Sequence, residues 1–294
     1  RSPSRGLGDV YKRQVLLCCC PFACNGEDMS SIIMNFSNVY SGQDFIHDDN
    51  SIYMDMSDIT GTDCYCDDDA AAEIKGRIGN MPVKAVHYID SGNYHYVSSI
   101  WLDKITEPFT LVVFDNHPDM QPPAFGDILS CGGWIKNVLD NNGYLEKVLI
   151  IGVNRKLTVE LEDELKMYTE SGKAAFITRQ EIADMLDCSA DGCEELYTDM
   201  YADAADKYVG EGHKVYISLD KDVLDERIVS TNWDQGDMRL NEVSSYINAI
   251  LKNNELAGMD VCGEPSLGQA HDDAVIRSNG VNRYFSNIMK NFLL

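Results

Sequence analysis

Residues 109–119 read FTLVVFDNHPD, an apolar stretch that passes directly into polar residues. Residues 109–114 are apolar or β-branched throughout, which is typical of a strand buried on both faces of a sheet. Asp115, His117 and Asp119 follow at alternate positions, so an extended backbone directs their side chains to one side. The stretch therefore predicts a buried strand that ends in a cluster of possible metal ligands. A solvated polar loop is the alternative.

Similar apolar runs recur along the chain and alternate with segments of helical periodicity. Strands are expected at residues 83–89, 109–114, 147–153, 174–177, 214–219 and 256–262, and helices at 157–172, 193–209, 241–253 and 280–294. This alternation is typical of β-α-β units and predicts an α/β fold, with a mostly parallel sheet and helices on both faces. Because no internal repeat or linker interrupts the pattern, residues 29–294 are expected to form a single domain.

Residues 1–28 differ from the rest of the chain. Residues 9–14 resemble the translation of a transposon end used in preparing sequencing libraries, so residues 1–28 are interpreted as a sequencing artefact or non-native leader. The apolar residues 15–23 leave a secretory signal as the alternative. A start at Met29 or Met34 is favoured, because the basic residues of that signal would come from the suspect segment.

The composition excludes several classes of function. The chain has 294 residues, 44% of them hydrophobic, which is enough for a sizeable core. Its 48 acidic and 24 basic residues give a net charge of −24, which repels phosphate, so neither nucleic acid nor an anionic membrane is an expected partner. No apolar run approaches the roughly 18 residues that a membrane-spanning helix needs.

The cysteines are expected to be reduced thiols. Four of the ten lie in residues 1–28, and the others are scattered through a chain large enough to need no disulfides, which favours a cytoplasmic protein. Cys64 and Cys66 lack a second ligand pair at zinc-binding spacing. Core packing is therefore the expected role of these six residues, which are Cys64, Cys66, Cys131, Cys188, Cys193 and Cys262.

Two further clusters follow other expected strands. Asp220 and Asp222 share a face after the run at 215–217 and would repel each other unless a cation lay between them, although an acidic turn is the alternative. His95 closes the loop at residues 92–95, where a lone histidine is a weak signal. His47, His87 and His213 have no companions at ligand spacing and are expected to be structural.

Ligands of α/β proteins bind beyond the carboxyl ends of the strands, so these clusters are expected to meet. Together they supply two imidazoles and four carboxylates, a mixed set that suits two Mn²⁺-like ions better than a thiolate zinc site. Bridging carboxylates would hold such ions about 3.5–4 Å apart. The predicted metal ligands are His95, Asp115, His117, Asp119, Asp220 and Asp222.

With these three clusters in this order, the sequence resembles the arginase/agmatinase/formiminoglutamase (ureohydrolase) superfamily. Members carry a Gly-rich loop ending in His, then Asp-x-His-x-Asp, then Ser-x-Asp-x-Asp-x-x-Asp, which match residues 92–95, 115–119 and 218–225. The resemblance implies a three-layer αβα sandwich and two Mn²⁺ ions, and relatives are commonly homo-oligomers. By resemblance, His95 and Asp119 bind one ion, His117 and Asp222 bind the other, and Asp115 and Asp220 bridge both.

The resemblance also implies a reaction. The two ions would make hydroxide available from a shared water, and the hydroxide would attack the carbon of a guanidino, amidino or formimino group in a small molecule. Asp119 would hold the nucleophile and relay its proton to the leaving nitrogen. Glu264 would face the cationic nitrogens of the substrate, although it lies four residues after Asp260, where relatives have this glutamate three residues after.

Three segments depart from the family pattern. Residues 129–134 contain no histidine where arginases and agmatinases carry a proton shuttle, and the loop is closer to that of formiminoglutamases. Arg155 and Lys156 stand where arginases have acidic residues, which favours a substrate carboxylate if the two side chains face the site. Residues 226–238 replace the Pro/Gly/Thr-rich stretch of the family.

These departures leave two alternatives to a manganese ureohydrolase. The first is an amide hydrolase similar to the related deacetylases, which lack the full ligand set and usually use one zinc. The second is a catalytically inert protein that binds metal for structure or sensing.

Overall fold

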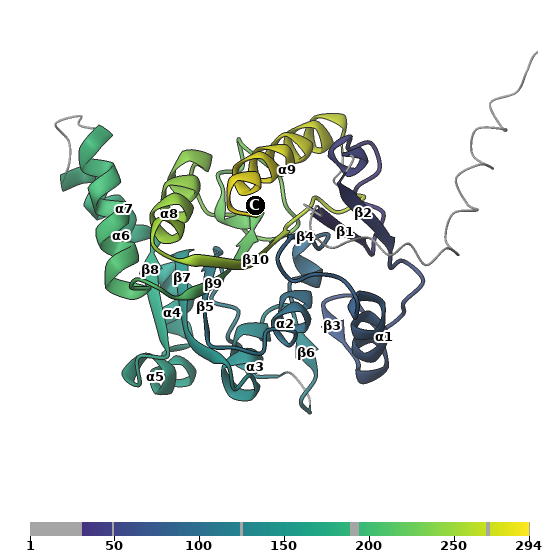
Figure 1. The fold of residues 1–294 in the computed structure, drawn as a ribbon, viewed down its shortest axis with the longest axis horizontal. Coiled ribbons are helices and arrows are strands. Elements are labelled where there is room, and N and C mark those ends of the chain that lie inside the picture. The colour runs from purple at the N-terminus through teal and green to yellow at the C-terminus, as the bar shows by residue number, and fades with distance from the viewer. Residues whose placement is uncertain (1–30, 49, 124–125, 189–193, 269–270, 294) are drawn as a thin grey trace, which may run out of the picture.

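An eight-stranded sheet runs through the centre of the computed structural model, which describes residues 31–293 except 49, 124–125, 189–193 and 269–270 (Figure 1). The expected leader, residues 1–28, lies outside the described residues. The strands follow the order β2-β1-β4-β10-β9-β5-β7-β8, and every neighbouring pair is parallel. Their bounds are β1 Ser31–Asn35, β2 Ser51–Asp55, β4 Val86–Tyr88, β5 Phe109–Phe114, β7 Leu145–Val153, β8 Ala174–Thr178, β9 Lys214–Asp220 and β10 Glu255–Cys262.

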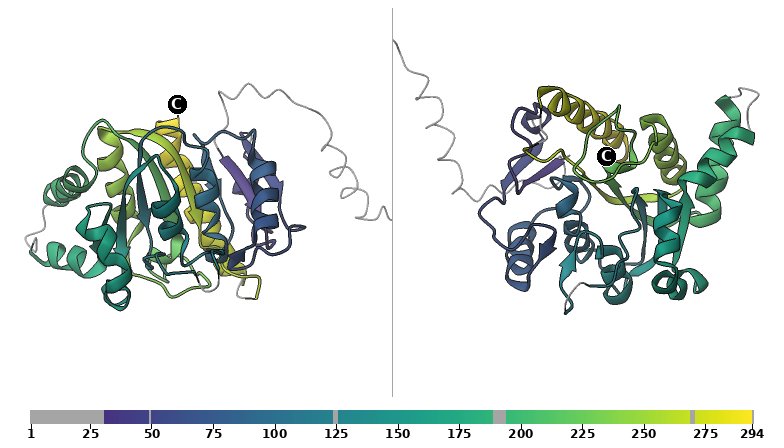
Figure 2. Two further views of the ribbon diagram at one scale, coloured as in Figure 1. Left: turned by 90° about the horizontal axis from the view of Figure 1, so that it is seen from below. Right: turned by 180° about the vertical axis from the view of Figure 1, so that it is seen from behind.

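Helices cover both faces of this sheet, which confirms the three-layer αβα sandwich (Figure 2). One layer contains α1 Asp68–Ile78, α2 Val97–Leu102, α3 Trp134–Asn141 and α5 Glu162–Glu170. The other contains α6 Arg179–Cys188, α7 Glu194–Tyr208, α8 Leu240–Lys252 and α9 Asp272–Leu293. Shorter elements connect the layers: β3 Tyr65–Cys66 pairs antiparallel with β6 Leu129–Ser130, α4 spans Arg155–Glu160, and η2 Phe45–His47, η3 Gly92–Tyr94 and η4 Lys221–Val223 are single 3-10 turns.

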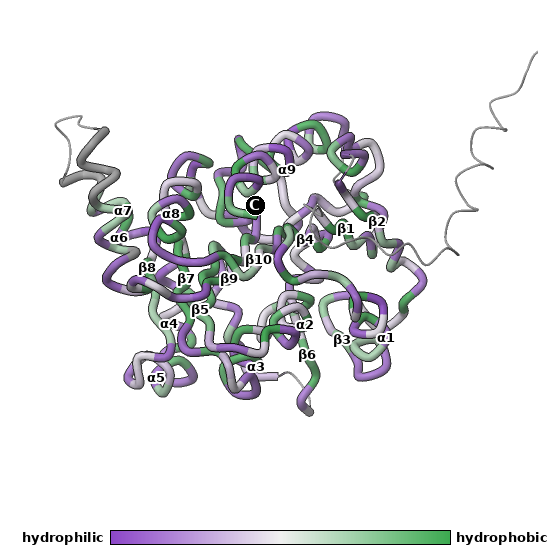
Figure 3. Tube along the Cα trace, in the orientation of Figure 1, coloured by the Kyte–Doolittle hydropathy of each residue, from purple (hydrophilic) through white to green (hydrophobic). Residues whose placement is uncertain are grey.

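The alternation of side chains along the strands explains the two layers. In β5, Leu111 and Val113 point to the first helical layer, whereas Val112 and Phe114 point to the second. All four are fully buried, so both faces of the strand need apolar residues at these positions. Figure 3 shows the same pattern at the scale of the chain, with hydrophobic strands inside and mixed helices outside.

The structure differs from the sequence-based expectation in several places. The expected set omitted α1, α2, α3 and α6, and α9 begins at Asp272 rather than at residue 280. The helix expected over 157–172 is broken at Leu161, whose φ of −107° and ψ of 17° end α4 before α5 begins. Asn154 caps the amide of Lys156 at 3.0 Å, which starts α4 earlier than the apolar pattern indicates. β1 and β2, at one end of the sheet, are five-residue strands that the expected set omitted.

The order of the strands determines where a site can form. β4, β10, β9 and β5 are consecutive neighbours, so the loops that follow them emerge side by side. No helix among the described residues is long and apolar enough to cross a membrane.

Candidate metal centre

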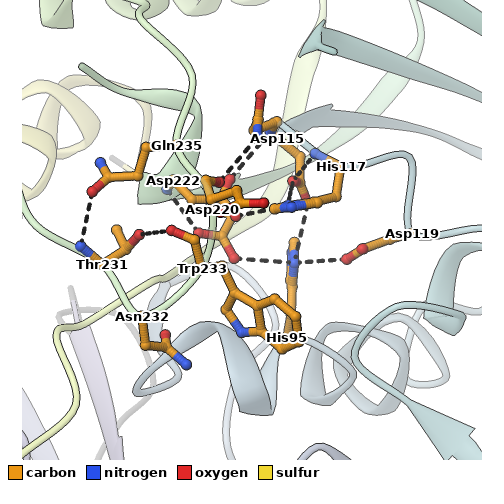
Figure 4. Close-up of polar contacts among 12 residues, drawn as sticks. His95, Asp115, His117, Asp119, Asp220, Asp222, Thr231, Asn232, Trp233 and Gln235 are labelled. Atoms are coloured by element: carbon orange, nitrogen blue, oxygen red, sulfur yellow. Dashed lines mark hydrogen bonds and ion pairs between the residues drawn. The ribbon is translucent and has the colours of Figure 1, made fainter. Parts of the chain in front are cut away.

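All six predicted ligands meet at the carboxyl edge of the sheet (Figure 4). The three residues of the first cluster follow β5, the aspartates of the second lie at the end of β9 and in η4, and His95 follows η3. Five of the six are buried, and His117 is partly exposed. The residues are His95, Asp115, His117, Asp119, Asp220 and Asp222.

One group of carboxylates surrounds His95. Its Nδ1 lies 3.1 Å from Asp119 Oδ2, 3.3 Å from Asp115 Oδ2 and 3.5 Å from Asp220 Oδ2. Three acidic side chains from two strands thus converge on one ring nitrogen.

A second group surrounds His117. Its Nδ1 lies 2.9 Å from Asp222 Oδ2 and 3.4 Å from Asp115 Oδ1. Asp115 therefore turns one carboxylate oxygen toward each histidine. This is the arrangement that a carboxylate bridging two cations requires.

Backbone hydrogen bonds fix the orientation of these carboxylates. The amide of His117 donates to Asp115 Oδ1 at 2.6 Å, and the amide of Asp222 donates to Asp220 Oδ1 at 2.8 Å. Asp119 has a φ of 46°, in the left-handed region that non-glycine residues seldom occupy, and Trp134 Nε1 donates to its Oδ2 at 2.8 Å. The amide of Ile135 also donates to the Asp119 carbonyl at 3.0 Å, so contacts on both main chain and side chain hold the strained backbone of Asp119.

A hydrogen-bond chain sets the tautomer of His95. Ser218 Oγ donates to Asp260 Oδ1 at 2.7 Å, so it accepts from His95 Nε2–H at 2.9 Å. The proton of the neutral ring is therefore on Nε2, and the lone pair of Nδ1 faces the carboxylates. Such outer partners commonly orient metal-binding histidines in this way.

The buried carboxylates of the site repel one another, and a bound cation would relieve this repulsion. Burial, followed by the charges of Asp222 and Asp115, raises the pKa of Asp220, and burial and Asp115 raise the pKa of Asp222. Asp115 Oδ2 is buried and has no hydrogen-bond partner among the described residues. Unpaired buried carboxylate oxygens are costly, so the donor set fits a pair of divalent cations.

A cavity of about 340 Å³ opens above these groups. This volume suits a small molecule and is far too small for a folded partner. Its walls carry Cys64, Tyr65, Gln121, Ser130, Cys131, Leu157, Glu160, Leu161 and Trp233, in addition to the metal-ligand candidates.

A model of the arginase family matches residues 87–276, more than half of the chain and all six ligand candidates. This chain belongs to the arginase family. The match begins within β4 and extends into α9, so it includes β5 and β9 with the loops that carry the six ligand candidates.

Individual relatives of this arginase-family chain are distant. An uncharacterized protein of Thermotoga maritima is 29% identical over 180 residues, which are 61% of this chain and 58% of that protein, so the chain spans little more than half of its relative's length. The solved proclavaminate amidino hydrolase of Streptomyces clavuligerus has a TM-score of 0.64 at 16% identity and covers 90% of this chain and 92% of its own. The formimidoylglutamase of Bacillus subtilis has a TM-score of 0.60 at 12% identity and covers 90% and 89%.

The placement of Glu264 in this arginase-family chain differs from the expectation. Its carboxylate does not line the cavity but is buried behind the sheet edge, where it forms an ion pair with Lys221 Nζ. Ser278 Oγ and Gln43 Nε2 donate to Glu264 Oε2 at 2.6 Å and 2.7 Å, and Asn282 Nδ2 donates to Glu264 Oε1 at 2.7 Å. These partners occupy both carboxylate oxygens.

Gly263 explains why Glu264 points inward. Gly263 is the residue three positions after Asp260, where relatives are expected to carry the substrate-facing glutamate, and its φ is 86°. A Cβ there would lie 2.5 Å from Asp220 Oδ1 and 2.8 Å from the amide nitrogen of Lys221. No side chain fits at that position, and the next residue turns toward the core.

The three departing loops have different relations to the cavity. Ser130 and Cys131 line it, so the segment without a histidine does form part of the wall. Arg155 and Lys156 are exposed and do not line it, and Lys156 Nζ lies 3.8 Å from Glu160 Oε1. The expected preference for a substrate carboxylate therefore has no support from their position.

Trp233, from the segment that replaces the Pro/Gly/Thr-rich stretch, forms another wall. Its ring lies edge-on to His117 with centroids 6.1 Å apart, and its Nε1 donates to Asn93 Oδ1 at 3.0 Å. Asn232 Nδ2 donates to the same oxygen at 2.7 Å. The loop after β4 and the loop after β9 thus close one side of the site together.

Sequence reasoning missed one residue of the cluster, Cys262. It packs in the core as expected, but its Sγ also lies 3.0 Å from Asp220 Oδ2. The sequence does indicate that Cys262 and Asp260 share a face, because they are two residues apart in the same strand. The neighbour relation of β10 and β9 could not be derived from the sequence.

Proposed function

We propose that this chain is a binuclear metal hydrolase that cleaves a non-peptide C–N bond in a small linear amidine or guanidine compound. The observation that carries the proposal is the pair of histidine-centred groups that share Asp115, at 3.3 Å from His95 and 3.4 Å from His117. Membership of the arginase family supports hydrolysis as the reaction class.

In this proposal, His95 and Asp119 would hold one ion, and His117 and Asp222 would hold the other. Asp115 and Asp220 would serve both ions. Imidazole and carboxylate donors suit Mn²⁺, so these six residues, taken by themselves, favour Mn²⁺ at both positions. When bound, such ions lower the pKa of a coordinated water and so supply a nucleophile near neutral pH.

The protein itself would orient the reaction through Asp119. Both Trp134 and His95 contact its Oδ2. Oδ1 is then the oxygen that could accept a proton from the attacking water and deliver it to the leaving nitrogen. The Trp134 contact would hold the carboxylate in place during that transfer.

Amide hydrolysis is a second candidate, favoured by the position of Glu264. With that carboxylate buried against Lys221, Glu160 is the one acidic residue beyond the ligand candidates among the described residues that line the cavity. Glu160 lies on an exposed turn of α4. A neutral acetylated amine would need no carboxylate partner, whereas a guanidinium would benefit from one.

Turnover by the Mn²⁺-loaded protein tests the proposal. The protein is assayed against guanidino, formimino and acetylated amines, together with Asp222→Ala and the control Asp225→Asn, whose carboxylate is paired with Arg227 and does not line the cavity. We expect turnover of a guanidino or formimino compound, a loss of about 100-fold or more in Asp222→Ala, and little change in the control. Turnover of acetylated amines alone would favour the second candidate, and no turnover of any class would favour an inert metal-binding protein.

A further inference from the structure

β10 brings a thiol into the group around His95. Cys262 is the last residue of β10 and is fully buried. β10 lies between β4 and β9, and its register pairs Cys262 with Asp220. As a result, His95, Asp220 and Cys262 offer ligand atoms that all lie within 4.8 Å of one another.

The thiol shares this space with carboxylate oxygens that face the same way. Asp220 Oδ1 accepts from the amide of Asp222, which leaves Oδ2 directed toward Cys262 Sγ and His95 Nδ1. Asp115 Oδ2, 3.3 Å from His95 Nδ1, is buried and has no hydrogen-bond partner among the described residues. His95 thus has the unpaired Asp115 oxygen in one group of possible ligands and the Cys262 thiol in another, which indicates a cation position with a sulfur donor.

We propose that Cys262 is a ligand of the ion held by His95 and Asp220, and that its thiolate makes this position selective for a thiophilic ion such as Zn²⁺. The inference rests on the proposed binuclear centre. When the ion binds, the Sγ–H bond breaks, the proton passes to solvent and an Sγ–metal bond forms. Thiolate donors favour zinc, whereas carboxylate and water donors suit manganese, so the His117 position keeps the manganese preference.

Co²⁺ substitution tests sulfur ligation without relying on activity. Thiolate ligation of Co²⁺ produces an intense charge-transfer band in the near ultraviolet. The wild-type chain, Cys262→Ser, Cys262→Ala and Cys131→Ser are titrated with Co²⁺. Cys131→Ser is the matched control, because Cys131 lines the cavity above the site but belongs to no ligand group among the described residues.

We expect the band in the wild-type chain and in Cys131→Ser, and its loss in both Cys262 variants. X-ray absorption of the Zn²⁺-loaded wild-type chain should show a sulfur neighbour at about 2.3 Å, a measurement that needs no variant to fold. Most sites bind Zn²⁺ more tightly than Mn²⁺, so the ratio of the two affinities is compared between the wild-type chain and the variant. We expect the Zn²⁺/Mn²⁺ affinity ratio to be lower in Cys262→Ser by about tenfold or more.

Two results would overturn the inference, and they differ in what else they affect. Metal binding without a charge-transfer band or zinc–sulfur scattering would remove Cys262 as a ligand and leave the binuclear centre standing. Absence of any bound ion in the wild-type chain would overturn both this inference and the proposed function.

Discussion

Asp115 connects the two halves of the candidate site, because its two oxygens face two different histidines. Asp119, by contrast, approaches His95 alone, and its Oδ2 is also held by Trp134. Asp115 and Asp119 therefore contact different numbers of histidines, although they lie in one five-residue stretch. The effects of replacing them should differ.

Replacing Asp115 should remove more metal than replacing Asp119. We expect Asp115→Ala to lose both ions and Asp119→Ala to lose mainly the ion beside His95, because Asp115 contacts both histidines whereas Asp119 contacts only His95. Elemental analysis after Mn²⁺ loading and desalting measures the content per chain. Equal metal loss in the two variants would contradict the bridging role, and Asp225→Asn controls for unspecific loss.

The buried pair of Lys221 and Glu264 should matter for stability. The side chains of both residues are almost completely buried, at 0% and 1% exposure, so Lys221→Met would leave the Glu264 carboxylate without a countercharge. We expect the free energy of unfolding to fall by about 3–5 kcal/mol, measured by chemical denaturation in the presence of EDTA.

Lys214, the first residue of β9, provides the matched control. Lys214 pairs with Glu107 at 2.6 Å, but the Glu107 side chain is 59% exposed, so Lys214→Met should cost at most about 1 kcal/mol. The double variant Lys221→Met/Glu264→Gln should recover part of the loss, because no buried charge is left unpaired. Equal costs for the two lysines would contradict this account.

His87 should make stability depend on pH. Its ring is fully buried and stacked on Trp101 at 3.7 Å, and Nε2 lies 3.3 Å from the Pro82 carbonyl, so Nδ1 accepts from Tyr216. Burial lowers the pKa of His87 to about 3, against about 6.5 when unfolded. Between these values the unfolded chain binds the extra proton, so stability falls as the pH falls below about 6.5.

His87→Gln removes this contribution. From pH 7 to pH 5, the wild-type chain should lose about 2 kcal/mol more unfolding free energy than the variant does. The unfolding free energies of both proteins are measured with denaturant at both pH values in EDTA. Contributions from groups other than His87 are the same in the two proteins and cancel in the comparison. Parallel losses in the two proteins would show that His87 is not buried in its neutral form.

At the scale of elements, η3 and the loop after β9 fit together through Gly92. A Cβ at Gly92 would lie 2.6 Å from Trp233 Cδ1 and 3.2 Å from Asp220 Oδ2. The small residue thus permits Trp233 to close the side of the cavity.

Gly92→Ala should displace Trp233. Trp101 and Trp134 are fully buried, whereas Trp233 is 42% exposed, so acrylamide quenching of fluorescence reports mainly on Trp233. We expect stronger quenching in Gly92→Ala and no change in Gly143→Ala, where a Cβ meets nothing within 4 Å. Unchanged quenching in Gly92→Ala would mean that the wall tolerates the methyl group.

The elements also show what a sequence pattern can predict. The strands β5, β7 and β9 were predicted nearly to the residue, because a short, continuous apolar run rich in β-branched residues is typical of a strand buried on both faces. The break at Leu161 was not predicted, since a partly buried leucine continues the apolar periodicity of the helix even where the backbone turns.

The same distinction applies to the site. The period of two placed Asp220 and Asp222 on one face, but the order of strands that sets Cys262 beside Asp220 is a property of the whole sheet. The inward turn of Glu264 depends on the lack of space at Gly263, which only coordinates reveal. Local chemistry could be predicted from the sequence, and contacts between distant strands could not.

For the whole molecule, metal binding should be coupled to folding. The chain carries a net charge of −24, and the site concentrates four buried aspartates that an unfolded chain would separate. Free Mn²⁺ at 100 times its dissociation constant should stabilise the fold by about 2.7 kcal/mol per ion. Thermal unfolding with Mn²⁺ and with EDTA measures the shift, and an equal shift in Asp115→Ala would trace it to ions bound elsewhere.

Anomalous diffraction from crystals grown with Mn²⁺ and Zn²⁺ tests the binuclear centre most directly. We predict two peaks about 3.5–4 Å apart, one beside His95 Nδ1 and one beside His117 Nδ1, with Asp115 in contact with both. A single peak, or side chains of Asp115 and Asp222 that contact no ion, would contradict a shared two-ion site.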